Sequence, residues 1–462
     1  MPFRVEPGKA AHVAVIGAGF TGSLCAVHLL RGLPPGSRVS LLDRTGRFGP
    51  GLAYGTANAE HLLNVRAANM SAFPDAPGDF VLWLWRRDPL GDAGGSVPPS
   101  GHAFVPRGVY GRYVSETLQE ASADAAARGV RLDMLGHDVA DLWEDADGIR
   151  LRLSAGTVMA ADAAVLCVGN FPPELPVAEG TVPESPRVIR DPWDQAALDR
   201  IGADDPVLVI GTGLTMADML LALDERGHRG PVTALSRRGL MPTVHAPTVA
   251  GRMDLDAAPR TALGLLRWIR GAVREGQAWR AVIDALRPAT IAIWRALPPV
   301  EKRRFLRHAR PYWEVHRHRL APEVEARIRV ARGTGRLTLR AGRILALHAD
   351  GSGVRLIVRN RGGGTERIDT GWLINCSGPQ ADYARVRDPL VRRLLDRGIV
   401  HPDPLGLGLE VDGDLALVGA SGPSRRLFAL GPPTKGAFWE ITAVPDIRTQ
   451  VAGFAAWLAG QP

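Results

Sequence analysis

The chain has 462 residues and a hydrophobic fraction of 45%, which predict a globular protein of two or three domains. It contains no apolar run of about 20 residues and no signal-peptide core at its start, so we expect a cytoplasmic protein without a membrane span. Its three cysteines form no CxxC pair, which argues against dithiol chemistry and predicts that Cys167 and Cys376 are small buried residues.

The first predicted element is a buried strand over residues 12–16, which leads directly into a glycine-rich turn, Gly17-Ala18-Gly19-Phe20-Thr21-Gly22. In this pattern Gly17 permits a tight turn, and Gly19 lets the backbone approach a pyrophosphate. Gly22 lets the next helix pack closely on the strand. The spacing is typical of a dinucleotide-binding fingerprint.

A helix predicted over residues 23–31 follows this turn, and its N-terminus offers unpaired N–H groups to an anion. A second strand over 38–43 ends at Asp43, about 20 residues past the last glycine, where an acid accepts hydrogen bonds from ribose hydroxyls. These elements predict dinucleotide binding, with Phe20, Thr21 and Arg44 as further candidate contacts. A glycine turn in an unrelated sheet is the alternative.

A second fingerprint, Gly211-Thr212-Gly213-Leu214-Thr215-Met216, follows a predicted strand over residues 206–210. Gly211 and Gly213 occupy the positions that face phosphates, and Thr215 is a further candidate contact. Met216 replaces the third glycine, so we expect the helix over 217–226 to lie slightly farther from its strand. Two such sites in one chain predict two nucleotide cofactors.

The strand predicted over residues 231–235 leads to Ser236, Arg237 and Arg238 and not to an acid. Arginine side chains suit a ribose 2′-phosphate, whereas a carboxylate would repel it, so the pattern favours NADPH over NADH. A solvent-facing arginine in an arginine-rich protein is the alternative.

Each fingerprint is followed by a similar stretch, from Gly129 to Gly169 and from Gly335 to Gly378, with a short strand, a hairpin and a buried strand. This internal repeat predicts an α/β fold with two Rossmann-like dinucleotide-binding domains and β-meanders. Val139, Gly169 and Gly378 are candidate cofactor contacts in these stretches.

Apolar residues recur at helical spacing between the second fingerprint and the stretch that begins at Gly335, with breaks at Pro288 and Pro298. They predict a helical insertion over about 255–330. The formal charge of the chain is +8, and basic residues are dense in this insertion, from Arg303 to Arg319. A solvated helix face and an anionic ligand site are both compatible with them, and nucleic acid is the least favoured partner.

The histidines form no metal-ligand set, and the sequence identifies no catalytic residue.

Further short blocks carry a resemblance to a known family. They are Gly51–Thr56, His61–Ala67 with Met70-Ser71, Phe104–Arg107 with Tyr110–Tyr113, and Leu427–Pro432. With the two fingerprints, these blocks resemble the two-dinucleotide-binding flavoprotein superfamily. Within it, the chain is similar to bacterial FAD/NAD(P)-binding proteins distantly related to ornithine and lysine N-hydroxylases and other class B flavin monooxygenases.

The resemblance implies FAD at the first fingerprint and NADPH at the second. It places the flavin along Tyr54, Asn64, Val65 and Met70. It also implies that the segment with Gly431, Gly436, Phe438 and Trp439 brings a helix N-terminus toward the pyrimidine edge of the flavin, where negative charge develops. Pro432 stands where the superfamily has an aspartate.

Segment order predicts a FAD domain over residues 1–190 and 379–462, with an NADPH domain over 191–378 between its two parts. Nicotinamide and flavin would then meet between the domains. The resemblance and the absent dithiol favour an NADPH-linked flavin monooxygenase that uses molecular oxygen on a small amine or other soft nucleophile, and the arginines suggest a carboxylate-bearing substrate. An NADPH-dependent reductase or dehydrogenase and a non-catalytic flavin-binding partner protein are the alternatives, and the oligomeric state is not predicted.

Overall fold

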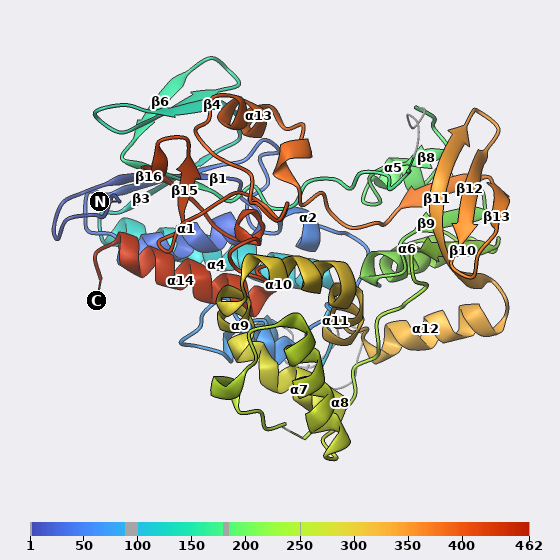
Figure 1. The fold of residues 1–462 in the computed structure, drawn as a ribbon. Helices are drawn as coiled ribbons and strands as arrows, with labels where there is room; N and C mark the ends of the chain where they lie inside the picture. The colour runs from blue at the N-terminus through green and yellow to red at the C-terminus, as the bar shows by residue number, and fades with distance from the viewer. Residues whose placement is uncertain (1, 88–99, 179–183, 250, 462) are drawn as a thin grey trace. The chain divides into compact units, whose positions relative to one another are not determined.

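The computed structural model describes residues 2–87, 100–178, 184–249 and 251–461 (Figure 1). The chain divides into two compact units. The first unit contains residues 1–59, 65–170 and 381–462, and the second contains residues 60–64 and 171–380. Within the described parts of the chain, no helix is long and apolar enough to cross a membrane.

The first unit is built on a six-stranded sheet in which all neighbouring pairs are parallel except β15 with β16. Its central strand, β1, is buried along residues 13–16, as the continuous apolar run predicts. The strand order is β15 (Ala416–Gly419), β16 (Gly422–Ala429), β7 (Ala163–Leu166), β1 (His12–Ile16), β2 (Arg38–Leu42) and β3 (Arg131–Leu135).

Three long helices of this unit pack side by side, with α1 in contact with both of the others (Figure 1). They are α1 (Phe20–Gly32), α4 (Arg107–Ala127) and α14 (Val444–Leu458). Helix α1 begins at Phe20 and not at residue 23, because Gly19 is already its N-cap. The glycine turn therefore leads straight into the helix. The remaining helices of the unit are α2 (Gly51–Tyr54), α3 (Asp79–Arg87) and α13 (Pro389–Asp396).

The meander of the first unit forms a separate three-stranded antiparallel sheet of β4 (Val139–Glu144), β5 (Ile149–Leu153) and β6 (Val158–Ala161). The corresponding meander of the second unit continues its main sheet instead. The cause is the long strand β11 (Leu337–Ala349). Its first residues pair in parallel with β10 (Val232–Ser236), and its later residues pair antiparallel with β12 (Val354–Asn360).

The sheet of the second unit has seven strands, and its core contains Leu208, Leu356, Val358 and Leu373. Its edge strand β8 lies at residues 188–189, within the range that the sequence predicts for the first domain. Around β11, the order is β13 (Thr365–Thr370), β12 (Val354–Asn360), β11, β10 (Val232–Ser236), β9 (Val207–Ile210), β14 (Trp372–Asn375) and β8 (Val188–Ile189). The helices associated with these strands are α5 (Gln195–Leu198), α6 (Leu214–Glu225) and α12 (Pro322–Gly333).

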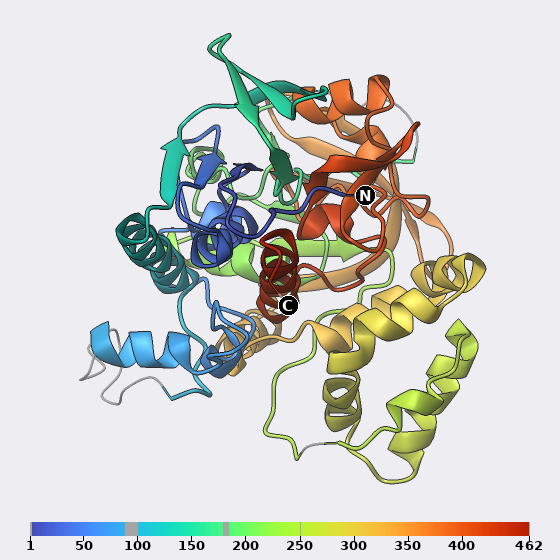
Figure 2. The ribbon, with the colours of Figure 1, turned by 90° about the vertical axis from the view of Figure 1, so that its left-hand side faces the viewer.

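The predicted insertion is helical, and Figure 2 shows its helices gathered together. Pro288 falls in a short 3-10 turn and Pro298 directly precedes a helix, so both prolines interrupt the helical run as expected. The helices are α7 (Ala262–Arg274), α8 (Trp279–Leu286), α9 (Thr290–Ala296), α10 (Pro299–Arg304) and α11 (Arg310–Arg317), with a π-helical turn over Phe305–Ala309 before α11.

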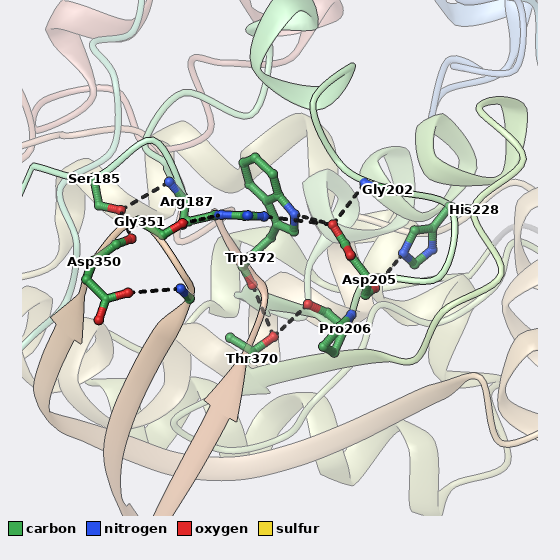
Figure 3. A network of polar contacts seen from close by, with 11 residues as sticks. Ser185, Arg187, Gly202, Asp205, Pro206, His228, Asp350, Gly351, Thr370 and Trp372 are labelled. Carbon is green, nitrogen blue, oxygen red and sulfur yellow. Dashed lines mark hydrogen bonds and ion pairs between the residues drawn. The ribbon is translucent and has the colours of Figure 1, made fainter.

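A polar network joins the beginnings of β9 and β14 in the second unit (Figure 3). The Trp372 indole N–H donates to the Asp205 carboxylate at 2.7 Å, and the Arg187 guanidinium lies 4.5 Å from the Trp372 ring centroid. The Thr370 hydroxyl donates to the Pro206 carbonyl at 2.8 Å. Because this network lies at the amino ends of the strands, away from the glycine turn, we interpret it as structural.

The Trp372–Asp205 hydrogen bond predicts a pH-dependent loss of stability in Trp372→Phe. The bond from Trp372, followed by the Gly202 N–H and the nearby Arg187 charge, lowers the pKa of Asp205. A lowered folded-state pKa stabilises the fold above the unfolded-state pKa, and this contribution disappears as pH falls through the folded-state pKa. We expect Trp372→Phe to lower the free energy of unfolding by about 1 kcal/mol at pH 7, a value reduced for the exposure of Asp205.

Urea unfolding followed by circular dichroism at pH 7 and at pH 3 would measure this effect. The difference between Trp372→Phe and the parent protein should shrink at the lower pH. In an Asp205→Asn background the difference should no longer depend on pH. A difference of equal size at both pH values would contradict the role given to the carboxylate.

Candidate functional site

The first glycine turn lies at the end of β1 and is tightly enclosed by its neighbours. Gly17 has φ +96°, and its N–H donates to the Leu42 carbonyl of β2 at 2.8 Å. A Cβ at Gly17 would lie 2.5 Å from the Cys167 carbonyl oxygen, just after β7. Both the backbone angle and the lack of space therefore require glycine here.

The other two glycines of this turn serve different purposes. A Cβ at Gly22 would lie 1.8 Å from the Gly17 carbonyl oxygen, so this glycine allows α1 to pack against the turn. Gly19 has φ −69° and ψ −169°, which any residue adopts, and a Cβ there would lie no closer than 3.5 Å to the protein. The fold itself does not require glycine at Gly19. Its small size leaves space for a ligand beside the N-terminus of α1.

Asp43 is held next to this turn. Its Oδ2 accepts the Ala18 N–H at 3.0 Å, and its Oδ1 accepts the Thr45 N–H and hydroxyl at 2.8 and 2.6 Å. The carboxylate is therefore fixed at the end of β2, where a ribose reader is expected. Arg44, a further candidate contact, is bound by acids of the protein: its Nη2 lies 2.6 Å from Asp388 and 3.5 Å from Asp138.

The second glycine turn is built in the same way as the first. Gly211 has φ +108°, its N–H donates to the Leu235 carbonyl at 2.8 Å, and its Cβ would lie 2.2 Å from the Cys376 carbonyl oxygen. Gly213 has no protein atom within 4 Å of an added Cβ. The two turns thus share a required first glycine and a second glycine at which an added Cβ would meet no clash with the protein. Met216, in place of the third glycine, is fully buried in the first turn of α6.

Ser236 occupies the position in the second unit that Asp43 occupies in the first. Leu42 pairs with the last residue of β1, and Leu235 pairs with the last residue of β9. Asp43 follows Leu42 and Ser236 follows Leu235, so the two residues occupy equivalent positions. The Ser236 and Thr212 hydroxyls are hydrogen-bonded at 2.9 Å, and Ser236 Oγ accepts the Gly239 N–H at 3.0 Å. This position therefore carries no carboxylate to repel a phosphate.

The two predicted phosphate-binding arginines follow Ser236 directly. Arg237 is exposed, and Arg238 is half-buried with its guanidinium 5.5 Å from the Tyr312 ring centroid. Thr215 is half-buried on the first turn of α6. Gly169 and Gly378, which follow β7 and β14, have φ +69° and +93° and open space at their Cβ positions.

Several candidate flavin contacts lie in the first unit around an aromatic cluster. The Tyr54 ring of α2 lies 5.7 Å from Phe20 and 4.7 Å from Tyr110, measured between ring centroids. Burial raises the pKa of Tyr54 to about 12, so its hydroxyl stays protonated at neutral pH. Met70 is fully buried, and Val139 is buried at the start of β4.

Asn64 and Val65 lie on opposite sides of a unit boundary. Asn64 belongs to the second unit, where its carbonyl oxygen lies 3.0 Å from Nε2 of His245. Val65 belongs to the first unit. The segment around Asn64 is held in the second unit by further contacts, because the fully buried His61 ring lies 3.1 Å from the Asp218 carbonyl oxygen.

Comparisons with known proteins agree with this geometry. Residues 14–171 match a family model described as FAD-NAD(P)-binding. No match was found among curated proteins. Reduced ornithine hydroxylase from Pseudomonas aeruginosa is a similar solved structure, with 15% identity, a TM-score of 0.65, and coverage of 98% of this chain and 99% of that one.

Two other solved structures extend the comparison. An ornithine N-hydroxylase from Kutzneria sp. 744, solved with reduced FAD, NADP⁺ and L-ornithine, has 14% identity, a TM-score of 0.65, and coverage of 97% of this chain and 99% of that one. Thioredoxin reductase from Lactococcus lactis has 12% identity, a TM-score of 0.50, and coverage of 97% and 99%. The chain has the fold of the two-dinucleotide-binding flavoproteins. Its first fingerprint lies in a FAD/NAD(P)-binding domain.

The C-terminal segment of this flavoprotein fold corrects one expectation. The segment with Gly431, Gly436, Phe438 and Trp439 was expected to start an α-helix, but it contains a 3-10 turn over Pro432–Thr434 followed by further turns. Helix α14 begins only at Val444. Glu440 adopts φ +72°, a left-handed backbone that cannot continue a right-handed α-helix and that separates these turns from α14.

The 3-10 turn nevertheless lies beside the first glycine turn. A Cβ at Gly431 would lie 2.7 Å from the Thr21 hydroxyl oxygen. Gln450 of α14 holds this turn, since its side chain accepts the Gly431 N–H at 2.8 Å and donates to the Thr434 hydroxyl at 3.0 Å. Phe438 is half-buried, Trp439 is buried, and Gly436 packs against the Asp403 carboxylate. Sequence reasoning missed Gln450 because no local motif marks it.

The basic cluster of the insertion is partly neutralised within the protein. Arg319 is 3% exposed and pairs with Asp284 at 3.0 Å, and Arg310 pairs with Glu314 at 2.6 Å. Arg303 and Arg307 are exposed. Across the described ranges, no group of three or more His, Cys, Asp or Glu side chains is arranged to hold a metal ion.

Proposed function

We propose that the protein is an FAD-dependent, NADPH-linked oxidoreductase, and specifically a flavin monooxygenase. The observation that carries the proposal is the matched pair of glycine turns, in which a Cβ at Gly19 or Gly213 would lie no closer than 3.5 Å to any protein atom. Space for a pyrophosphate next to a helix N-terminus is what each dinucleotide needs. Bound FAD and NADPH would supply the hydride acceptor and the hydride donor.

The residues of the chain bind and orient these groups. The N-terminus of α1 would bind the FAD pyrophosphate, and Asp43 would accept hydrogen bonds from its ribose. The N-terminus of α6 would bind the pyrophosphate of NADPH, and Arg237 with Arg238 would bind its 2′-phosphate. The contribution of the protein to hydride transfer is this positioning.

Several observations favour a monooxygenase over a dithiol reductase. Cys25, Cys167 and Cys376 are all buried. Burial also raises the pKa of the Cys167 and Cys376 thiols well above the ordinary value, which disfavours the reactive thiolate. The similar ornithine hydroxylases act on a small amine with a carboxylate, and exposed arginines such as Arg303 and Arg307 would suit a substrate of that class.

Stopped-flow absorbance of the FAD-loaded protein would test the proposal. Anaerobic mixing with NADPH should remove the oxidised-flavin absorbance, and a second mix with oxygen and a substrate amine should give a product that carries one oxygen atom from ¹⁸O₂. Anaerobic electron transfer to another acceptor, with only hydrogen peroxide formed under oxygen, would favour a reductase. Retention of the oxidised-flavin absorbance with saturating NADPH and candidate amines would favour a non-catalytic flavin-binding protein.

A further inference from the structure

The turn between β12 and β13 brings a third guanidinium to the predicted phosphate site. Ser236 is aligned with Ala341 in the parallel ladder of β10 and β11, and the Ala341 carbonyl accepts the Arg361 N–H at 3.0 Å. Nη1 of Arg361 lies 3.4 Å from the Arg238 carbonyl oxygen. Folding therefore places Arg361 beside Arg238, although 123 positions separate them in the sequence.

The backbone around this site is well defined on both sides. In the turn of Arg361, the Asn360 N–H donates to the Gly364 carbonyl at 3.0 Å. On the other side, the Ser236 hydroxyl accepts the Gly239 N–H, as described above. The Gly239 turn packs against β11, because a Cβ at Gly239 would lie 3.2 Å from the Ala341 Cβ.

The three arginines carry charge that the described part of the protein does not neutralise. Among the residues described, Arg237, Arg238 and Arg361 form no ion pair, whereas the neighbouring Arg340 is paired with Glu366 at 2.7 Å. Arg237 and Arg361 are also exposed. Like charges at short range repel one another, so an anion bound among them would be stabilised.

Tyr312 covers one side of Arg238. Its ring centroid lies 5.5 Å from the Arg238 guanidinium carbon, and 45% of Tyr312 is exposed. An aromatic ring restricts the orientation of a guanidinium that stacks on it and leaves the N–H groups at the guanidinium edge free to donate. Helix α11 of the insertion thus contributes a residue to this site.

We infer that Arg361 and Tyr312, with Arg237 and Arg238, form a receptor for a phosphomonoester on a ribose and set the preference for NADPH over NADH. This inference rests on the proposed function and adds residues to its NADPH site. Arg361 donates to the 2′-phosphate, because a dianionic phosphate is bound best by several planar guanidinium donors. Tyr312 is a positioning residue that orients Arg238.

Calorimetric titration of the full-length, FAD-loaded protein with 2′,5′-ADP and 5′-AMP tests the inference, because these nucleotides differ only in the 2′-phosphate. Arg361→Ala should weaken 2′,5′-ADP binding by about tenfold and leave 5′-AMP binding unchanged, and Arg361→Lys should recover part of the loss. Tyr312→Ala should weaken 2′,5′-ADP binding by about threefold, and Tyr312→Phe should preserve it.

Arg355→Ala is the matched control. Arg355 is also exposed and lies on the same hairpin, at the end opposite to Arg361, where it faces Asp369. The substitution Arg355→Ala removes the same charge as Arg361→Ala. The Arg355→Ala variant should bind both nucleotides as the parent protein does. Equal losses in Arg355→Ala and Arg361→Ala, or full retention of 2′,5′-ADP binding in Arg361→Ala, would overturn the inference. Equal affinity of the parent protein for the two nucleotides would overturn the proposed NADPH preference itself.

Discussion

Gly19→Val is expected to weaken FAD binding by about 100-fold or more while the protein remains folded. The backbone at Gly19 has angles that valine accepts, and the nearest protein atom to an added Cβ is 3.5 Å away. The added methyl groups would therefore occupy the space proposed for the FAD pyrophosphate and not space within the core. Flavin content after purification and titration of the apoprotein with FAD would measure the loss.

Two neighbouring substitutions separate loss of the ligand from loss of the fold. Gly22→Ala places a Cβ 1.8 Å from a backbone oxygen, so it should lower the melting temperature. Gly213→Val occupies the equivalent open position in the second turn and should weaken NADPH binding while FAD remains bound. Normal flavin content in Gly19→Val would refute the assignment of FAD to the first turn. A melting temperature as low as that of Gly22→Ala would mean that Gly19 is required by the fold.

The double substitution Arg237→Ala with Arg238→Ala is expected to weaken NADPH binding by about 100-fold and to leave NADH binding nearly unchanged. Each arginine would supply charge-assisted hydrogen bonds to the 2′-phosphate, and NADH lacks that group. Because both side chains lie at the surface of a turn after β10, their removal should leave the core of the second unit intact. Apparent dissociation constants from the rate of anaerobic flavin reduction would measure the change.

Ionic strength provides a control for this double variant. General attraction between a basic surface and an anionic nucleotide weakens for both coenzymes as salt is added, whereas a site specific for the 2′-phosphate retains its preference. The ratio of NADPH to NADH affinities should therefore fall in the double variant at every salt concentration tested. An unchanged ratio would exclude Arg237 and Arg238 as the phosphate-binding residues.

Much of the fold could be predicted because the informative signals are local. Strand β1 lies at residues 12–16 as predicted, since a short continuous apolar run before a glycine turn is typical of a buried parallel strand. The equivalence of Gly17 and Gly211 also follows from spacing alone. In the structure, an added Cβ at either glycine would clash with the carbonyl oxygen of the cysteine that follows the neighbouring strand. The segment from β1 to β2 of the first unit is encoded within its own stretch of sequence, whereas β16 and α14 of the same unit come from the C-terminal part of the chain.

The parts that could not be predicted depend on contacts between distant residues. Arg361 reaches Arg238 only because β11 pairs with β10 on one side and β12 on the other. Gln450 supports the Gly431 turn from a helix whose sequence gives no sign of that role. The α-helix expected after Gly431 is interrupted by the left-handed backbone of Glu440, a conformation that the residue types of this segment do not reveal.

The assignment of residues 60–64 to the second unit has a consequence for dissecting the protein. An expressed fragment of residues 191–378 would lack both β8 and this short segment. Without His61, the Asp218 carbonyl would lose a buried neighbour, and the ion pair between Glu60 and Arg327 would also be lost. Genetic truncation at the apparent domain limits would therefore cut into the second unit, so recombination between such proteins must exchange two separate pieces of gene to transfer this unit intact.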